Sequence, residues 1–323
     1  MTERWRDTGM ERPRTPPEQY GTSVTRPPDF DAFWQEVWDE ASRIPLEPRV
    51  EPVPLRSNEH VATYEGSYTS LNRVRIATWY CVPRRPGPHP AVIYLPGYIS
   101  EPPLQKGREW AARGYACCVV AVRGKLRSNA QFNPGYPGLL TYNIVDRYTY
   151  SYRGLYIDAC RAVDFLLSRP EVDPERIAVT GSSQGGGLSI VVASMRREIK
   201  AACPGAPYLC GIRDAIQLTH TYPYEEINDY LRLYPERREQ VLATVDYFDG
   251  INLAPRITCP TLVNIGGKDT ICPPETGYAV FKAIGASIKE LKVYPEEGHS
   301  AGAAQHEPLI IEWIARYIGS PSS

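Results

Sequence analysis

The sequence lacks the features that would assign it to a membrane or to nucleic acid. Its longest apolar run, Ala116–Val122, is far too short to span a bilayer. The charged N-terminus has no apolar segment of the kind found in secretory signals. With 36 basic and 37 acidic residues, the net charge is −1, so no electrostatic attraction to nucleic acid or to an anionic membrane is expected. We therefore predict neither of these partners.

Metal-ligand spacing is also missing. The chain contains no Cys-x-x-Cys and no histidine pair at ligand spacing, so we expect no structural zinc and predict no cofactor. The 8 cysteines are an even number, which would allow disulfides. However, the chain is long, no secretory signal is seen, and Cys117 and Cys118 are adjacent in an apolar segment. We predict reduced, buried thiols.

Proline and tyrosine, in contrast, are abundant, at 31 and 22 of 323 residues. This length suits one large domain or two modest ones. Several tyrosines cluster within one loop-rich stretch: Tyr136, Tyr142, Tyr148, Tyr150, Tyr152 and Tyr156. Their rings are suited to stacking on a sugar, but tyrosines also pack long loops while their hydroxyls stay hydrated. We favour packing.

The chain begins with a polar, proline-rich arm, residues 1–28, which we expect to lie on the surface or on a neighbouring subunit. Asp29 suits the N-cap of a first helix, and Pro45 ends that helix. The apolar residues Phe30, Phe33, Trp34, Val37, Trp38 and Ala41 follow helical spacing along one face. Residues 61–68 and 74–82 have the β-branched and aromatic content of strands.

Strands and helices then alternate along the chain. We expect strands at Ala91–Leu95, Tyr115–Val122, Arg176–Thr180, Ala201–Cys203, Thr261–Ile265 and Lys289–Tyr294. We expect helices at Leu104–Arg113, Tyr152–Ser168 (with Leu166 and Leu167 inward), Leu188–Arg197 and Gln305–Ile318. Continuously apolar strands in βα units predict an α/β fold, with a mostly parallel, doubly wound sheet flanked by helices. Residues 206–256 interrupt this alternation, and we expect them to form a helical insertion over the functional site. We expect residues 29–323 to form a single domain.

The run Gly181-Ser-Ser-Gln-Gly185 fits Gly-x-Ser-x-Gly, with Ser183 at its centre. A strand before it and a helix after it are the context of a nucleophile elbow, in which small residues allow a sharp turn that exposes the serine oxygen. The backbone N–H of Gln184 at the helix start is suited to bind an oxyanion. The alternative is a glycine-rich strand–helix turn that carries an ordinary serine.

A serine nucleophile needs a base, and the base needs an orienting acid. Asp269 follows the strand Thr261–Ile265, and His299 follows the last strand, which gives the chain order Ser, Asp, His that suits this elbow. Asp269 would otherwise cap the next helix. We prefer His299 to His306, which lies in or at the start of the last helix, and to the remaining three histidines: His60, His89 and His220.

A second oxyanion donor should come from the loop after the strand Ala91–Leu95. That loop begins Pro96-Gly97-Tyr98. Gly97 allows a tight turn, and the N–H of Tyr98 would be the donor. A plain βα turn is the alternative.

These residues together resemble the acetyl xylan esterase / cephalosporin C deacetylase family, carbohydrate esterase family seven. The resemblance covers about residues 28–318. It is carried by Asp29–Trp34, Pro96–Tyr98, Val122–Gly124, Tyr150–Asp158 with Arg161–Val163, Gly181–Gly186, Tyr247–Asp249 with Asn252, Cys259–Leu262, Asp269, Cys272–Pro274, Tyr294–Pro295 and Gly298–His299.

The resemblance implies an α/β-hydrolase fold and removal of small acyl groups, chiefly acetyl, from sugars and related alcohols. It implies Ser183, Asp269 and His299 as the catalytic triad, and the amides of Tyr98 and Gln184 as the oxyanion hole. It also implies an acyl pocket near Tyr208 and Ile271, a hexamer built from dimers, and a cytoplasmic location.

Three positions depart from the family pattern: Pro96 replaces a histidine, Lys125 a glutamine, and Ser300 a glutamate. None belongs to the predicted triad. We therefore predict a metal-free serine esterase that acts on acetylated xylo-oligosaccharides or similar small-molecule esters. The alternatives are a general short-chain carboxylesterase with a non-sugar substrate, a peptidase of the same fold, and a catalytically silent ligand-binding protein.

Overall fold

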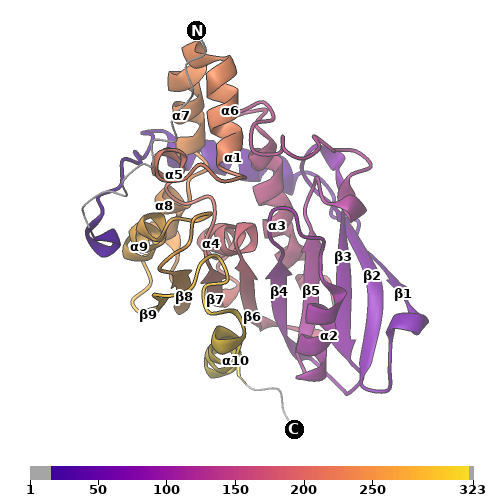
Figure 1. Ribbon diagram of the computed structural model, residues 1–323. Coiled ribbons are helices and arrows are strands. Elements are labelled where there is room, and N and C mark those ends of the chain that lie inside the picture. The colour runs from indigo at the N-terminus through magenta and orange to yellow at the C-terminus, as the bar shows by residue number, and fades with distance from the viewer. Residues whose placement is uncertain (1–15, 320–323) are drawn as a thin grey trace.

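A single nine-stranded sheet runs through residues 16–319, the part of the chain that the computed structural model describes (Figure 1). Its strands are β1 (Arg49–Pro52), β2 (Val61–Thr69), β3 (Arg75–Pro83), β4 (His89–Leu95), β5 (Ala116–Ala121), β6 (Val172–Ser182), β7 (Ile199–Gly205), β8 (Thr261–Gly266) and β9 (Lys289–Tyr294). The strand order is β1-β2-β3-β5-β4-β6-β7-β8-β9.

The sheet is parallel from β5 through β4 and β6 to β9, whereas β1, β2, β3 and β5 pair antiparallel in that order. The order reverses around β4, the topological switch point of an open α/β sheet. Ligands bind beyond the carboxyl ends of the strands at such a point. The predicted α/β-hydrolase fold with a mostly parallel sheet is confirmed.

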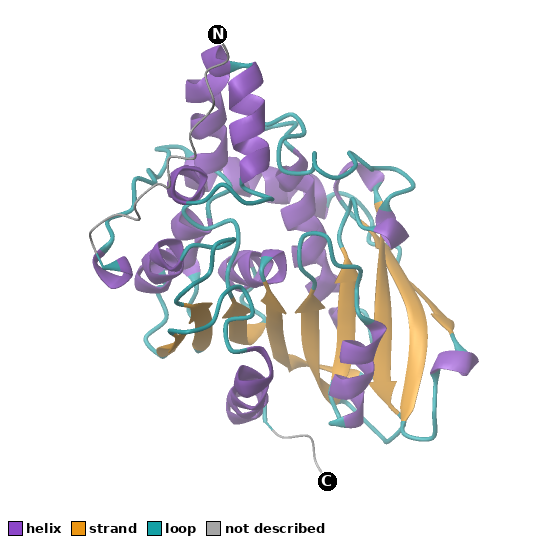
Figure 2. Ribbon diagram, viewed as in Figure 1, coloured by secondary structure: helices purple, strands orange, loops and turns teal. Residues whose placement is uncertain are grey.

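Helices cover both faces of this sheet (Figure 2). They are α1 (Phe30–Ser42), α2 (Leu104–Ala112), α3 (Ser151–Leu167), α4 (Gln184–Met195), α5 (Ile212–Leu218), α6 (Glu225–Leu233), α7 (Arg238–Asp246), α8 (Gly250–Leu253), α9 (Pro274–Ala283) and α10 (Ala303–Ile318). Trp110 of α2 and Trp313 of α10 belong to the apolar cluster on one face. The cluster on the other face is larger and includes α1, α3, α4 and α9.

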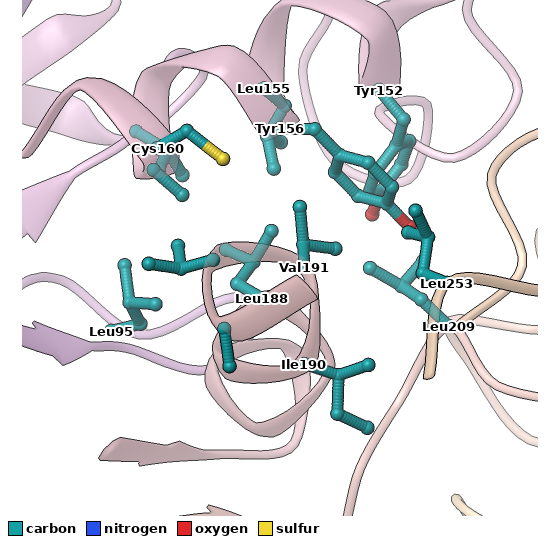
Figure 3. Packing of buried hydrophobic residues seen from close by; sticks show 14 of the residues in the cluster. Leu95, Tyr152, Leu155, Tyr156, Cys160, Leu188, Ile190, Val191, Leu209 and Leu253 are labelled. Carbon is teal, nitrogen blue, oxygen red and sulfur yellow. The ribbon is translucent and has the colours of Figure 1, made fainter. Parts of the chain in front are cut away.

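The core beneath the predicted elbow lies between α3 and α4 (Figure 3). Leu155 and Cys160 of α3 face Leu188 and Val191 of α4, and all four are fully buried. A helix that is apolar all round, such as α4, is stable only when it is covered on every side. Leu167, expected to point inward, is instead 40% exposed, because it is the last residue of α3 and lies at the edge of the layer.

The segment 206–256 contains α5 to α8, and α6 and α7 project beyond the edge toward which the parallel strands point (Figure 1). Asp249 joins its parts. This buried carboxylate accepts hydrogen bonds from the N–H groups of Gly211 (2.9 Å) and Ile212 (2.7 Å) before and at the start of α5, and from Ile251 (2.9 Å) in α8. Asp249 therefore holds the start of α5 and α8 together within the segment.

Residues 16–28 follow the surface of the same segment; residues 1–15 of the predicted arm lie outside the described part of the chain. Thr22 and Ser23 donate hydroxyl hydrogen bonds to Asp214, at 2.6 and 2.5 Å. Asp29 precedes α1 as predicted, but its side chain forms no cap. It instead binds Tyr247 and pairs with Arg147 at 3.0 Å, because these long-range partners compete with the local amides.

All eight cysteines fall within the described residues, and each is buried and unpaired, as predicted. Burial raises the pKa of the thiols, to about 12 for Cys118 and Cys160, so these side chains behave as small apolar groups. Within residues 16–319, no helix is long and apolar enough to cross a membrane.

Candidate active site

Ser183 lies at the sharp turn between β6 and α4, with φ of 60° and ψ of −120°. Such a conformation costs a non-glycine residue about 1–3 kcal/mol and persists only where its surroundings impose it. The neighbours of Ser183 leave no room for side chains. A Cβ at Gly181 would lie 2.3 Å, and one at Gly185 1.8 Å, from the carbonyl oxygen of Leu95. The close approach of the turn to β4 therefore requires glycine on both sides of Ser183.

Asp269 and His299 meet at the carboxyl ends of neighbouring strands. Asp269 follows β8 and His299 follows β9, and 2.8 Å separates Asp269 Oδ2 from His299 Nδ1. The other carboxylate oxygen, Oδ1, accepts the backbone N–H groups of Ile271 (2.8 Å) and Cys272 (2.9 Å). With both oxygens engaged, the buried carboxylate is fixed in one orientation and can hold the imidazole in one tautomer.

A pocket of about 460 Å³ brings Ser183 and His299 together with Tyr98 and Ile271. It opens beyond the carboxyl end of the sheet, where the topology predicts a ligand site. A larger hollow of 710 Å³ lies beside Trp34 and Arg196 and contains none of the predicted site residues. The smaller pocket is therefore the candidate active site, because it alone of the two holds a nucleophile and a base.

The structure places the competing histidines away from this pocket. His306 is buried in α10, and its Nδ1 lies 3.0 Å from the Tyr294 hydroxyl. Burial, with a smaller contribution from Lys292, lowers the pKa of His306 to about 4. His220 contacts Glu225 at 3.2 Å on the surface of the segment 206–256. None of these groups lines the wall that carries Ser183.

The two N–H groups expected to form an oxyanion hole belong to Gln184, which follows Ser183, and to Tyr98, which lines the same pocket. Gln184 is the first residue of α4, where an N–H group has no partner within its own helix. Its side chain is buried and donates to the Tyr152 hydroxyl at 3.0 Å, which fixes the residue. The N–H of Tyr98 has no acceptor among residues 16–319. Both groups are thus free to bind a developing negative charge.

Glu226 of α6 holds the loop that carries Tyr98. Its carboxylate accepts the Tyr98 hydroxyl at 2.5 Å and the N–H groups of Gly138 (2.8 Å) and Leu140 (3.2 Å). Burial raises the pKa of Glu226 and that of Tyr98. Glu226 could not be singled out from the sequence, because no pattern distinguishes it from the other acidic residues of a polar helix.

The structure places the two residues expected near an acyl pocket, Tyr208 and Ile271, in different surroundings. Ile271 lines the pocket as predicted, but Tyr208 is fully buried behind it. Its ring packs against Tyr98, with centroids 6.0 Å apart, and against Tyr224, at 4.6 Å. Its backbone N–H donates to the Ser183 carbonyl at 3.0 Å. Tyr208 is held behind the nucleophile and supports the wall of the pocket.

Asp269, His299 and the nearby Cys272 offer ligand atoms within 4.8 Å of one another. These residues fit a metal poorly, because the two carboxylate oxygens already bind two N–H groups and the imidazole. Burial and the charge of Asp269 also raise the pKa of the Cys272 thiol, whereas a metal binds the thiolate. The arrangement fits an orienting carboxylate.

Of the three positions that depart from the family pattern, two lie at the pocket. Pro96 lines it, and buried Lys125 donates from Nζ to the carbonyl oxygens of Gly97 and Tyr98. Ser300 lies at the surface and donates to Glu297.

The six tyrosines of the tyrosine-rich stretch divide into three buried residues and three exposed ones, the latter Tyr136, Tyr142 and Tyr148. Tyr150, Tyr152 and Tyr156 are buried packing residues, as favoured. Tyr136 is 56% exposed and stands at the pocket mouth, where Tyr222 of the segment 206–256 joins it.

Comparison with known proteins agrees with this geometry. Residues 13–317 match the family model described as acetyl xylan esterase (AXE1). Among curated relatives, the chain is 28% identical over 298 residues to an acetyl esterase, Axe7A, of Xylanibacter ruminicola. That alignment covers 88% of this chain and 66% of the relative, so the chain spans just under two thirds of that protein's length.

Solved structures show the same relation over nearly the whole chain. An acetyl xylan esterase from Paenibacillus sp. R4 superimposes with a TM-score of 0.88 at 34% identity, over 94% of this chain and 99% of the other. Acetyl xylan esterase 1 from Thermoanaerobacterium sp. JW/SL YS485 gives a TM-score of 0.84 at 27% identity, over 93% and 97% of the two chains.

Proposed function

This chain belongs to the acetyl xylan esterase family, and on that premise we propose that it removes acetyl groups from xylan-derived sugars with Ser183 as nucleophile. The observation that carries the proposal is the contact between Asp269 and His299 in the pocket of Ser183. Nucleophile, base and orienting acid come from three loops at one edge of the sheet.

In the first half of the reaction, Ser183 Oγ attacks the ester carbonyl carbon while Nε2 of His299 takes the hydroxyl proton. The carbonyl oxygen becomes an oxyanion and is bound by the N–H groups of Tyr98 and Gln184. The carbon–oxygen bond to the sugar then breaks, and the imidazolium gives its proton to the leaving alkoxide. Asp269 stabilises the imidazolium throughout.

In the second half, water attacks the acetyl–serine ester. His299 takes a proton from the water, the same N–H groups bind the second oxyanion, and acetate leaves as Ser183 regains its proton.

Initial rates on p-nitrophenyl esters from acetate to octanoate test the reaction. We expect rates to fall steeply beyond acetate or propionate, because the family removes acetyl groups and Ile271, expected near the acyl pocket, lines the cavity of Ser183. Ser183→Ala should lose nearly all turnover, whereas Ser194→Ala, at the far end of the same helix, should match the native chain. Turnover that survives in folded Ser183→Ala would refute the assignment, and a preference for long chains would favour a general carboxylesterase.

The two tyrosines at the mouth support a sugar as the leaving group. The ring centroids of Tyr98 and Tyr136 are 5.6 Å apart, and those of Tyr136 and Tyr222 are 6.4 Å apart. Tyr98, Tyr136 and Tyr222 together form a partly exposed aromatic rim of the pocket that contains Ser183. Exposed aromatic surface at the edge of a pocket is a common feature of ligand sites.

Comparing two substrates tests this part of the proposal. Tyr136→Ala should lower kcat/KM on an acetylated xylo-oligosaccharide about tenfold, a loss of about 1.4 kcal/mol. It should leave p-nitrophenyl acetate nearly unchanged, because that ester has no sugar ring. Tyr142→Ala is the control, since Tyr142 lies in the same loop and is also exposed, but packs against Phe132 outside the pocket. Equal losses on both substrates would contradict a sugar-binding role.

The homo-oligomeric assembly and the cytoplasmic location stay predictions. Sedimentation of the purified chain and fractionation of the source cells would test them.

A further inference from the structure

The ammonium group of Lys125 is buried against the loop that carries Tyr98. Only 3% of the residue is exposed, and Nζ donates to the carbonyl oxygens of both Gly97 and Tyr98. The segment that carries Lys125 is also fixed by a neighbouring ion pair. Arg123, two residues earlier, forms a two-point contact with buried Asp158, with both N–O distances 2.8 Å.

Lys125 has no carboxylate partner within the described residues. The charged group that acts on it is Glu101, whose Oε1 accepts the N–H of Leu126 at 2.6 Å. Around the same loop stand Arg127, which Glu101 also attracts, and Glu226, which binds the Tyr98 hydroxyl. The backbone carbonyls are therefore the direct partners of this cation.

The carbonyl of Gly97 and the N–H of Tyr98 belong to the same peptide unit. A cation bound to a peptide oxygen draws electron density toward it and makes the N–H of that unit a stronger donor. That N–H has no acceptor of its own among residues 16–319 and lies in the segment that lines the pocket. Lys125 therefore polarises the N–H group that the proposed reaction uses as an oxyanion donor.

We propose that Lys125 is a positioning residue of the oxyanion hole, which fixes and polarises the Gly97–Tyr98 peptide so that the Tyr98 N–H binds the developing oxyanion more strongly. The inference rests on the proposed esterase function, in which that N–H is a donor. Because the negative charge develops only in the transition state, the lysine should raise kcat and leave KM nearly unchanged.

The contact also makes the reaction sensitive to pH. Burial lowers the pKa of Lys125 to about 8, against a smaller opposing effect of Glu101. Above that pH the ammonium loses its proton and its charge, so the peptide is less polarised and kcat should fall. The alkaline loss of activity should therefore depend on the side chain at position 125.

Steady-state kinetics on p-nitrophenyl acetate from pH 6.5 to 10 test the proposal. Lys125→Gln and Lys125→Met should lower kcat about tenfold at pH 7, less than the loss expected for deleting an oxyanion donor, with KM changed less than about twofold. Both variants should lack the decline near pH 8. Lys289→Gln is the matched control, because Lys289 also binds backbone carbonyls, those of Phe281, Lys282 and Ile284, but does so at the end of α9.

A second readout does not depend on turnover. In protein labelled with ¹⁵N-tyrosine, the Tyr98 amide resonance, identified by its loss in Tyr98→Phe, should shift with a midpoint near pH 8. This titration should vanish in Lys125→Gln. If the native chain shows no esterase activity, the proposed function fails while the resonance still tests the contact. Native kcat in Lys125→Gln, or a Tyr98 resonance that is flat from pH 6.5 to 10, would overturn the inference.

Discussion

Replacing Asp269 with asparagine should nearly abolish catalysis while leaving the fold intact, and the contacts of the carboxylate show why. Oδ1 accepts two N–H groups, from Ile271 and Cys272, at 2.8 and 2.9 Å. Oδ2 faces Nδ1 of His299 at 2.8 Å. An asparagine must place its carbonyl oxygen where Oδ1 was, because an NH₂ group there would point donors at two donors.

The opposite rotamer would leave those two buried N–H groups without acceptors. Each such group costs about 1–3 kcal/mol, so the flip is unfavourable by about 2–6 kcal/mol. The NH₂ group is therefore directed at His299 Nδ1 and donates to it. The imidazole must then carry its own proton on Nε2, the nitrogen that should accept the proton of Ser183.

The wrong tautomer lowers kcat by about 10⁴-fold in serine hydrolases of this kind, which corresponds to about 5.5 kcal/mol in the activation barrier. Rates on p-nitrophenyl acetate at pH 7 would measure the loss, and thermal unfolding would check the fold, since the two N–H bonds are kept. Asp214→Asn is the control, because Asp214 is also buried but binds Thr22 and Ser23 away from the pocket. Folded Asp269→Asn with kcat within tenfold of native would refute the reasoning.

Two further predictions concern buried ionisable groups. Burial lowers the pKa of His306 from 6.5 to about 4, so between these pH values the unfolded chain binds more protons than the folded chain. The contribution of His306 to the free energy of unfolding is therefore complete above pH 6.5 and is lost as the pH falls toward 4. This contribution amounts to about 3 kcal/mol. Urea unfolding should show a smaller loss of stability between pH 7 and pH 4.5 in His306→Gln than in the native chain, and an equal loss in both would contradict the assignment. Glu226→Gln should lower both kcat and the thermal midpoint, since a neutral amide is a weaker acceptor for Tyr98; native values in activity and calorimetry would show that Glu226 does not hold the loop.

The sequence places the three predicted triad positions at one edge of the sheet because of how parallel sheets are built. Ser183, Asp269 and His299 each follow a strand that is recognisable from its apolar run. Parallel strands bring their carboxyl ends to one edge, so three positions far apart in the chain had to converge. The glycine pattern around Ser183 added the turn geometry, and the structure shows that the packing against Leu95 requires it.

Contacts made by side chains across loops could not be predicted in the same way. Asp29 has the residue type and position of an N-cap, yet binds Tyr247 and Arg147. Tyr208, expected near the acyl pocket, is fully buried and does not line the pocket of Ser183. No sequence pattern points to Glu226. In each case the partner depends on how the segment 206–256 folds back on the sheet, and no local pattern encodes that path.

The two pocket departures from the family pattern act on one short loop, and the loop's contacts suggest that they belong together. The segment after β4 forms no strand or helix before α2, so its position depends on side chains from outside it. Glu226 holds the Tyr98 hydroxyl from one side, and Lys125 holds the Gly97 and Tyr98 carbonyls from the other. Proline at position 96 restricts the backbone at the start of the loop, which reduces the freedom that these contacts must overcome. The proposed triad would thus act beside a loop that buried charge holds in place, so the rate of this enzyme should respond to pH through Lys125.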